Sequence, residues 1–428
     1  MLEVSLIATL LCIAVATAGL ARLNFHPSFF FLQIMLFYFL TNAVVIGSGL
    51  LSLGAFAIAL LLTLSYVAFS LLGSLLVSNL REVSPDVIKR KAKLANSDQF
   101  LKLITRVCIL ISLGGIFYLL HHAGYSPFVS NPLVEFINVA RKYALLRYED
   151  SNYREPFLAL FSTIFMYLGN ILAGVSFCID SNSRSKFKSV LLPLLPNILF
   201  SLVLTSRAGI FIGIMLFLSS YLSMAVYFKI RVNILPIVRK GIFYFCILIV
   251  VIWVPRVLRS GDVSNFSIEY FSFATEKVLS LLVLSFSAFS VWFENVFWIG
   301  NLERTHGSII FGGIASWFGV SRSKFDAVSL GDNLPETTIH GLFAAILSDF
   351  GLINGIVFIS LFGLMSGLGY VLVRKGYLAA FFMLITSYFF TLGMIVNSVI
   401  KFNNVNAAIV MASIIMIFLQ KEKSDEKV

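Results

Sequence analysis

Long apolar runs, separated by short charged segments, follow one another along the chain. A helix that crosses a membrane needs about 20 mainly apolar residues, and eleven segments approach this requirement. The predicted spans lie at about residues 2–20, 29–46, 54–77, 104–120, 156–178, 188–206, 208–228, 241–255, 345–373, 377–399 and 406–420. Because a helix satisfies its own backbone hydrogen bonds in lipid, the pattern predicts an all-α, polytopic membrane protein with about 11 transmembrane helices.

The composition excludes other classes of protein. Hydrophobic residues make up 59% of the 428 residues and charged residues only 12%, whereas a soluble domain has about 25% charged residues. Such a chain cannot cover a water-facing surface, and it lacks the alternating apolar and polar pattern of a porin-type barrel. No internal repeat or soluble domain interrupts the pattern, so residues 1–428 form one predicted integral-membrane domain.

The distribution of positive charge predicts the orientation. A net charge of +11 would suggest nucleic acid for a soluble protein. Here it reflects the excess of basic residues in cytoplasmic loops and attraction to anionic lipids, so we expect no nucleic-acid partner. Span parity places the basic segments on one side, which is predicted to be cytoplasmic. These segments are 78–105, 180–188, 229–240, Arg374–Lys375 and 420–428.

Two longer loops are predicted on the opposite, extracytoplasmic side, at residues 121–155 and 256–340. In the first, Asn131 and Pro132 are typical of a helix start, and Phe136, Ile137 and Ala140 share one face. We expect a surface helix that lies on the membrane. In the larger loop, the apolar run Val278–Phe293 is short for a span and favours an interfacial or re-entrant helix.

Arginines at the extracytoplasmic ends of spans are the first candidates for chemistry. Arg207 lies in a tight turn between two spans, and Arg256 and Arg259 follow another span three residues apart. Guanidinium groups suit phosphate, so these arginines could clamp a pyrophosphate. The alternatives are a snorkelling side chain that stabilises the turn and simple interfacial anchoring.

A polar stretch from Leu302 to Asp349 holds the second group of candidates. Glu336 and His340 are four apart, so a helix would bring them together, and either could deprotonate a hydroxyl group. The alternative for His340 is a cap or packing residue. Asp349 lies in or near the next span and needs a partner, for which an arginine is the obvious choice. The stretch contains Arg304, His306, Arg322, Lys324, Asp326, Asp332, Glu336, His340 and Asp349.

Motifs for cofactor chemistry do not occur in the sequence. There is no Gly-rich phosphate loop followed by Lys and Ser/Thr, and no His-Glu-x-x-His. The four cysteines lie inside apolar runs, where they are typical of core packing. We therefore expect no cofactor and no metal, and an extracytoplasmic site would draw its energy from a gradient or from an activated, lipid-linked substrate.

Two short segments and the layout of spans and loops resemble a known family, the Wzy-type oligosaccharide repeat-unit polymerases of bacterial O-antigen and capsule assembly. One segment is Ser206-Arg207-Ala208-Gly209. The other runs from His340-Gly341-Leu342-Phe343 to Asp349-Phe350-Gly351-Leu352-Ile353-Asn354-Gly355. The arginine-rich repeats of some members are not evident in the long loop. The resemblance implies a glycosyltransferase-like membrane fold in the bacterial inner (cytoplasmic) membrane, with an active site that faces the periplasm.

The resemblance also implies a reaction and its partners. An oligosaccharide would pass from one undecaprenyl-pyrophosphate carrier to the sugar end of another lipid-linked unit. Arg207, with Arg256 or Arg259, would neutralise the leaving pyrophosphate, and His340 or Glu336 would act on the acceptor hydroxyl. Arg304, Arg322 and Asp349 complete the predicted substrate-binding set. Membrane lipids and a protein that regulates chain length are further expected partners.

Three alternatives remain open. An O-antigen ligase of surface lipopolysaccharide would use the same donor with a different acceptor. A lipid-linked oligosaccharide flippase or another transporter would be expected to show repeats, broken helices and charges at the middle of the membrane. A membrane subunit without chemistry would not need arginines clustered at one face.

Overall fold

The computed structural model describes most of the chain as helices. The described residues are 25–46, 52–83, 90, 94, 97–126, 128, 131–149, 156–179, 183–204, 208–230, 285–300, 304–318, 325–326, 328–329, 337, 340–395 and 402–421. Within these residues there is no β-strand, only an isolated bridge between Val328 and Thr337. The all-α prediction is confirmed.

The apolar runs form the expected helices. Nine of the predicted spans correspond to α2 (Pro27–Ile46), α3 (Leu53–Leu76), α5 (Asp98–His122), α7 (Phe157–Ile179), α8 (Ser183–Val203), α9 (Ala208–Tyr227), α13 (Gly341–Arg374), α14 (Phe381–Leu392) and α15 (Asn403–Lys421). The predicted spans 2–20 and 241–255 lie outside the described residues. Six helices, α3, α5, α7, α9, α13 and α15, are long and apolar enough to cross a membrane. These six support a multi-pass membrane protein, and the count of about 11 stays a prediction.

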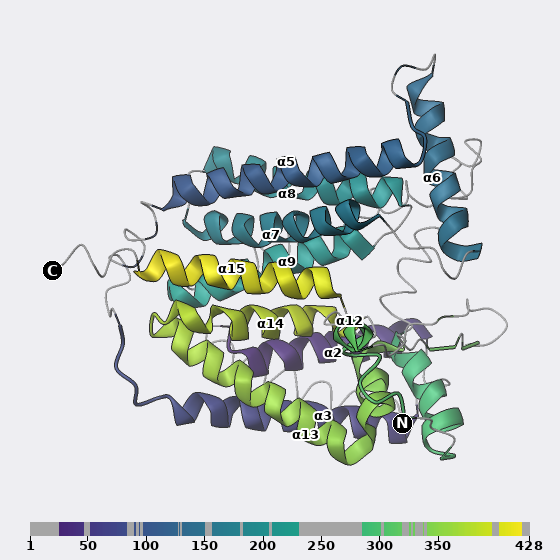
Figure 1. Ribbon diagram of the computed structural model, residues 1–428. Helices are drawn as coiled ribbons and strands as arrows, with labels where there is room; N and C mark the ends of the chain where they lie inside the picture. The colour runs from purple at the N-terminus through teal and green to yellow at the C-terminus, as the bar shows by residue number, and fades with distance from the viewer. Residues whose placement is uncertain are drawn as a thin grey trace.

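The long helices lie side by side in one bundle (Figure 1). Helix α13 packs mainly on α3, α5 on α7, and α7 on α9, while α14 and α15 contact α9 and α7 respectively. Helices α5 and α3 form opposite edges of the bundle (Figure 1). Because α5 ends at His122 and α13 ends at Arg374, we call the two ends of the bundle the His122 end and the Arg374 end.

Small residues bring α13 and α3 into close contact. A Cβ atom on Gly367 would lie 1.8 Å from the Ser70 carbonyl oxygen, and one on Gly363 would lie 2.5 Å from the Tyr66 carbonyl oxygen. Only glycine allows backbones to approach this closely. The four-residue spacing places both glycines on the same face of α13.

Basic side chains close the Arg374 end. The buried guanidinium of Arg90 donates to the carbonyl oxygens of Tyr227 (3.0 Å) and Arg374 (2.6 Å), which end α9 and α13. Lys229 pairs with Glu82 at 3.0 Å. Positive groups stabilise the exposed carbonyls at helix C-termini. Many of the basic residues at this end therefore hold helices together, in addition to any role in orientation.

Helix α13 breaks at Gly351, a feature that the predicted span 345–373 did not include. Gly351 has φ 71° and ψ −172°, a backbone conformation that is essentially restricted to glycine. The chain turns sharply there (Figure 1). We call Gly341–Phe350 the buried arm, because its side chains from Leu342 to Asp349 are all buried, and Leu352–Arg374 the spanning arm.

The His122 end carries the elements that were predicted for the two loops. Helix α6 (Pro132–Glu149) lies across this end (Figure 1), and the Asn131 side chain accepts a hydrogen bond from the Val134 N–H at 3.3 Å. Ala140 is buried against the bundle, whereas Arg141 is exposed. The helix predicted within residues 121–155 is thus confirmed, and its position on the membrane stays a prediction.

The described parts of the second predicted loop, 256–340, are also mostly helical. Residues 285–292 are α-helical and continue into the π-helix η3 (Phe293–Phe297), and α12 spans Gly312–Trp317. The Asn403 side chain at the start of α15 donates to the Gly313 carbonyl at 2.9 Å and so fastens α12 to the bundle. Residues 256–284 lie outside the described residues, so the size of this loop stays a prediction. Two short 3₁₀-helices, η4 (Leu378–Ala380) and η5 (Gly393–Ile395), flank α14.

Candidate functional site

A buried carboxylate lies at the break in α13. Asp349 accepts hydrogen bonds from the Thr305 hydroxyl and from the backbone N–H groups of Ile309 (3.1 Å) and Ile310 (2.7 Å). The Thr305 N–H also donates to the Ser348 carbonyl at 3.1 Å. The segment 304–310 therefore wraps around the end of the buried arm, although it is about forty residues away in the sequence.

Two left-handed residues make this wrapping possible. His306 has φ 47° and Gly307 has φ 85°, so the chain reverses between Thr305 and Ile309. This reversal directs successive N–H groups toward one carboxylate, an arrangement that suits an anion. Three donors surround Asp349 and so satisfy the hydrogen-bonding capacity of its buried carboxyl oxygens. We call residues 304–310 and Asp349 the Asp349 turn.

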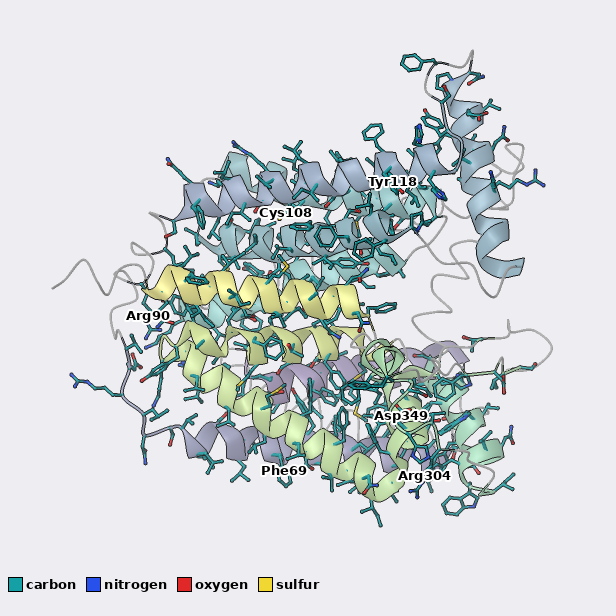
Figure 2. All side chains as sticks on the ribbon, in the orientation of Figure 1. Phe69, Arg90, Cys108, Tyr118, Arg304 and Asp349 are labelled. Atoms are coloured by element: carbon teal, nitrogen blue, oxygen red, sulfur yellow. The ribbon has the colours of Figure 1, made fainter. Side chains whose placement is uncertain are left out.

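Arg304 starts this turn and lies over the break in α13 at Gly351, which we call the elbow. A Cβ atom on Gly351 would lie 3.4 Å from the Arg304 guanidinium, and the side chain is otherwise exposed. Figure 2 shows Arg304 and Asp349 close to the elbow. We expected an arginine as the partner of Asp349, but the donors found among the described residues are a hydroxyl group and backbone amides.

The spanning arm presents an apolar face directly after the elbow. Ile353 is 78% exposed, and Val357 and Leu361 are also exposed at four-residue intervals. In a membrane, this row would contact lipid. We call this row the lipid-facing stripe, and Arg304 lies at the end of it that is nearest Gly351. Arg304 is also beside the N-terminal end of the spanning arm, where the helix dipole adds a partial positive charge.

His340 lies apart from this group, inside the core. It immediately precedes α13, its side chain is buried, and its ring centroid is 4.5 Å from that of Phe325. It also lines a small cavity of about 20 Å³ with Ser285 and Met394, which is room for about one water molecule. This placement agrees with the alternative that His340 is a packing residue.

The described residues around Glu336 and His340 do not form the helix on which their pairing was expected. Helix α13 begins only at Gly341, and Thr337 lies in the isolated bridge with Val328. The pairing of the two side chains stays a prediction. Glu336 itself lies outside the described residues.

The remaining predicted arginines also lie outside the described residues, namely Arg207, Arg256, Arg259 and Arg322. The helices on either side of Arg207 are described. Leu204 packs beside Leu119 and Leu120, close to the end of α5, so the connection between α8 and α9 is at the His122 end. Arg207 is thus expected at the same end of the bundle as Arg304.

Sequence reasoning missed the residues that hold Asp349. Thr305, Ile309 and Ile310 carry no motif, since backbone amides are common to almost every residue. The only local signal is Gly307, a residue that favours left-handed turns. Among the described residues no group of three potential metal ligands occurs.

Comparisons with known proteins do not identify a function for this site. No family model, no curated protein and no solved structure matches this chain. A function must therefore be argued from the geometry and charge of the described residues, because a helical bundle alone is compatible with many activities.

Proposed function

We propose that this protein polymerises undecaprenyl-pyrophosphate-linked oligosaccharide repeat units at the outer face of the bacterial inner membrane. It would thus be a glycosyltransferase of surface-polysaccharide assembly that requires no cofactor. The observation that carries the proposal is the position of Arg304, an exposed cation at the junction of the elbow and a lipid-facing stripe. The similarity of residues 206–209 and 340–355 to the Wzy-type polymerases supports the same reading.

A lipid pyrophosphate combines two chemical features, and the site has a counterpart for each. Guanidinium groups bind phosphate oxygens with two parallel hydrogen bonds, and the N-terminal end of the spanning arm favours negative charge. The stripe of Ile353, Val357 and Leu361 offers an apolar path for a prenyl chain. Because the Asp349 turn fixes Arg304, the cation would be in place before the lipid arrives.

The reaction needs stabilisation of a leaving group. The acceptor hydroxyl oxygen would form a bond to the anomeric carbon of the donor sugar, while the bond from that carbon to the pyrophosphate oxygen breaks. The hydroxyl proton would pass to a base or to the departing pyrophosphate. Arg304, joined by Arg207, Arg256, Arg259 or Arg322, would stabilise the developing negative charge. The buried position of His340 favours a supporting role for it, and Glu336 remains the candidate base.

The test is transfer by purified protein in proteoliposomes that contain the lipid-linked repeat unit. Arg304→Ala should lower the rate by about 10²- to 10³-fold, as expected for the loss of one charge-stabilising donor, and Arg304→Lys should recover part of it. His306→Asn is the matched control, because His306 is exposed on the same turn and asparagine tolerates its left-handed backbone. An Arg304→Ala protein that polymerises at the wild-type rate would contradict the proposal.

A second candidate, a lipid-linked oligosaccharide flippase, is favoured by one observation. Broken helices are typical of transporters, and α13 breaks at Gly351. Deletion of the gene in its host separates the candidates. Loss of the long polysaccharide ladder with retention of core plus one repeat indicates a polymerase, whereas complete loss of repeat sugars from the core indicates a flippase or a ligase.

A further inference from the structure

Two exposed aromatic residues lie beyond the same end of the bundle, next to helices on opposite edges. Trp298 is 71% exposed and follows η3, and Phe128 is 96% exposed in the connection between α5 and α6. In a chain that crosses a membrane, exposed aromatic residues close to the ends of the spans are typical of the membrane–water interface.

Trp298 is close to the lipid-facing helix α3. A Cβ atom on Gly54, in the first turn of α3, would lie 2.9 Å from the Phe293 ring, so η3 packs on the start of that helix. The ring centroids of Phe293 and Trp298 are 6.0 Å apart. Helix α3 is the least buried of the six candidate spans, so Trp298 and the exposed Ile299 lie beside a surface that would face lipid.

Phe128 occupies the corresponding place on the other edge. Helix α5 exposes Phe117 and Tyr118 near its end at His122. Helix α6 then runs across the bundle end, and one end of it projects beyond α5 (Figure 1). The residues that α6 buries, such as Val139 and Ala140, point toward the bundle. The end of α6 that projects beyond α5 therefore lies above the lipid that would surround α5.

We propose that Trp298 and Phe128 anchor the His122 end of the bundle in the head-group layer of the membrane, on opposite sides. Tryptophan prefers this layer because its ring is amphipathic, and an exposed phenylalanine at the same level leaves water by entering the boundary between head groups and acyl chains. The two anchors set the level of the bundle in the bilayer. Since Trp298 lies beside the start of α3, on which the spanning arm packs, this level places Arg304 near the lipid phosphates. The inference does not depend on the proposed reaction.

Fluorine NMR of the full chain in lipid nanodiscs can test this. The protein is labelled with fluorotryptophan, and Trp298→Phe identifies the resonance of Trp298 as the one that disappears. Phe128→Trp adds a resonance for the second anchor. Asn138→Trp is the matched control, because Asn138 is exposed on α6, on the face opposite Ala140.

Two relaxation agents then report the environment of each resonance. We expect a phosphatidylcholine with a nitroxide near its head group to broaden the Trp298 signal and the Phe128→Trp signal more than a water-soluble gadolinium chelate does. The Asn138→Trp signal should show the opposite order. If the soluble chelate broadens the signal at either anchor more strongly, the proposal is overturned for that residue. Retained resonances of the other tryptophans show that each variant is folded.

Discussion

Replacement of Asp349 tests the account of the site most directly. Asp349→Ala removes the acceptor for the Thr305 hydroxyl and for two buried N–H groups, those of Ile309 and Ile310. An orphaned buried donor costs about 1–3 kcal/mol, so the two amides alone should lower the free energy of unfolding by about 2–6 kcal/mol. This loss is a large fraction of the total stability of most proteins, which is about 5–15 kcal/mol.

Two further variants separate the contributions. Asp349→Asn keeps one oxygen but places an NH₂ group where the second oxygen accepted, so it should cost about 1–3 kcal/mol for one orphaned donor. Thr305→Val removes one hydrogen bond to the buried carboxyl group and should cost about 0.5–1.5 kcal/mol. We therefore expect Asp349→Ala to be the least stable variant.

The assay is a denaturant titration of the purified protein in detergent, which measures its unfolding midpoint. Limited proteolysis is performed at the same denaturant concentrations. The segment 304–310 should become accessible to protease in Asp349→Ala well below the denaturant concentration that unfolds the bundle. If Asp349→Ala unfolds at the wild-type midpoint and the turn stays protected, then the carboxylate does not hold the turn and the reasoning fails.

Three further predictions concern the bundle. Gly367→Ala should destabilise the protein by about 1–3 kcal/mol through overpacking, whereas Gly114→Ala, where a Cβ atom would meet nothing within 4 Å, should be neutral or stabilising in the same thermal unfolding assay. Arg90→Ala should lower the unfolding midpoint because it removes hydrogen bonds from two helix ends, and Arg90→Lys should restore only part of the lost stability. Equal midpoints for wild type and Arg90→Ala would refute the role of Arg90 in holding these helix ends. Burial lowers the pKa of His26, just before α2, to about 4. The unfolded chain takes up this proton below about pH 6.5, so stability from this site is complete above that pH and falls by about 2 kcal/mol at pH 5. His26→Gln should lack this part of the pH dependence, and parallel pH profiles of the two proteins would disprove it.

The local part of the structure could be predicted because it depends on local patterns. Apolar runs long enough for a helix became helices from α2 to α15, and Asn131 and Pro132 correctly marked the start of α6. Helix α6 buries Ala140, which lies on the predicted apolar face, and also Val139, which was not predicted. In each case, residues within one or two turns determine the outcome.

The glycines of α13 show that a local pattern does not predict the role of each residue. Gly351 breaks α13, whereas Gly367 lies within the same helix and serves as a contact point for α3. Both are glycines in an apolar run. Their roles differ because one is near Arg304 and the other is near the backbone of Ser70, and these neighbours are remote in the sequence.

The site residues also differ in what the local sequence predicts and what the packing of remote segments determines. Asp349 was expected to have an arginine as its partner, but its donors among the described residues are the Thr305 hydroxyl and the backbone amides of Ile309 and Ile310. His340 was a reasonable candidate base from its neighbours in the sequence, yet it is buried beside Phe325. Burial depends on what the rest of the chain places around a residue, which no local pattern records.

The sequence alone thus determined the class of the protein, an all-α bundle of membrane-spanning helices, because hydropathy and helix length act locally and need no partner. Only the tertiary structure decided that α13 has two arms, that segment 304–310 encloses Asp349, and that Arg304 is exposed whereas His340 is buried. These features arise from contacts between segments some forty residues apart. Their geometry exists only once the helices have packed.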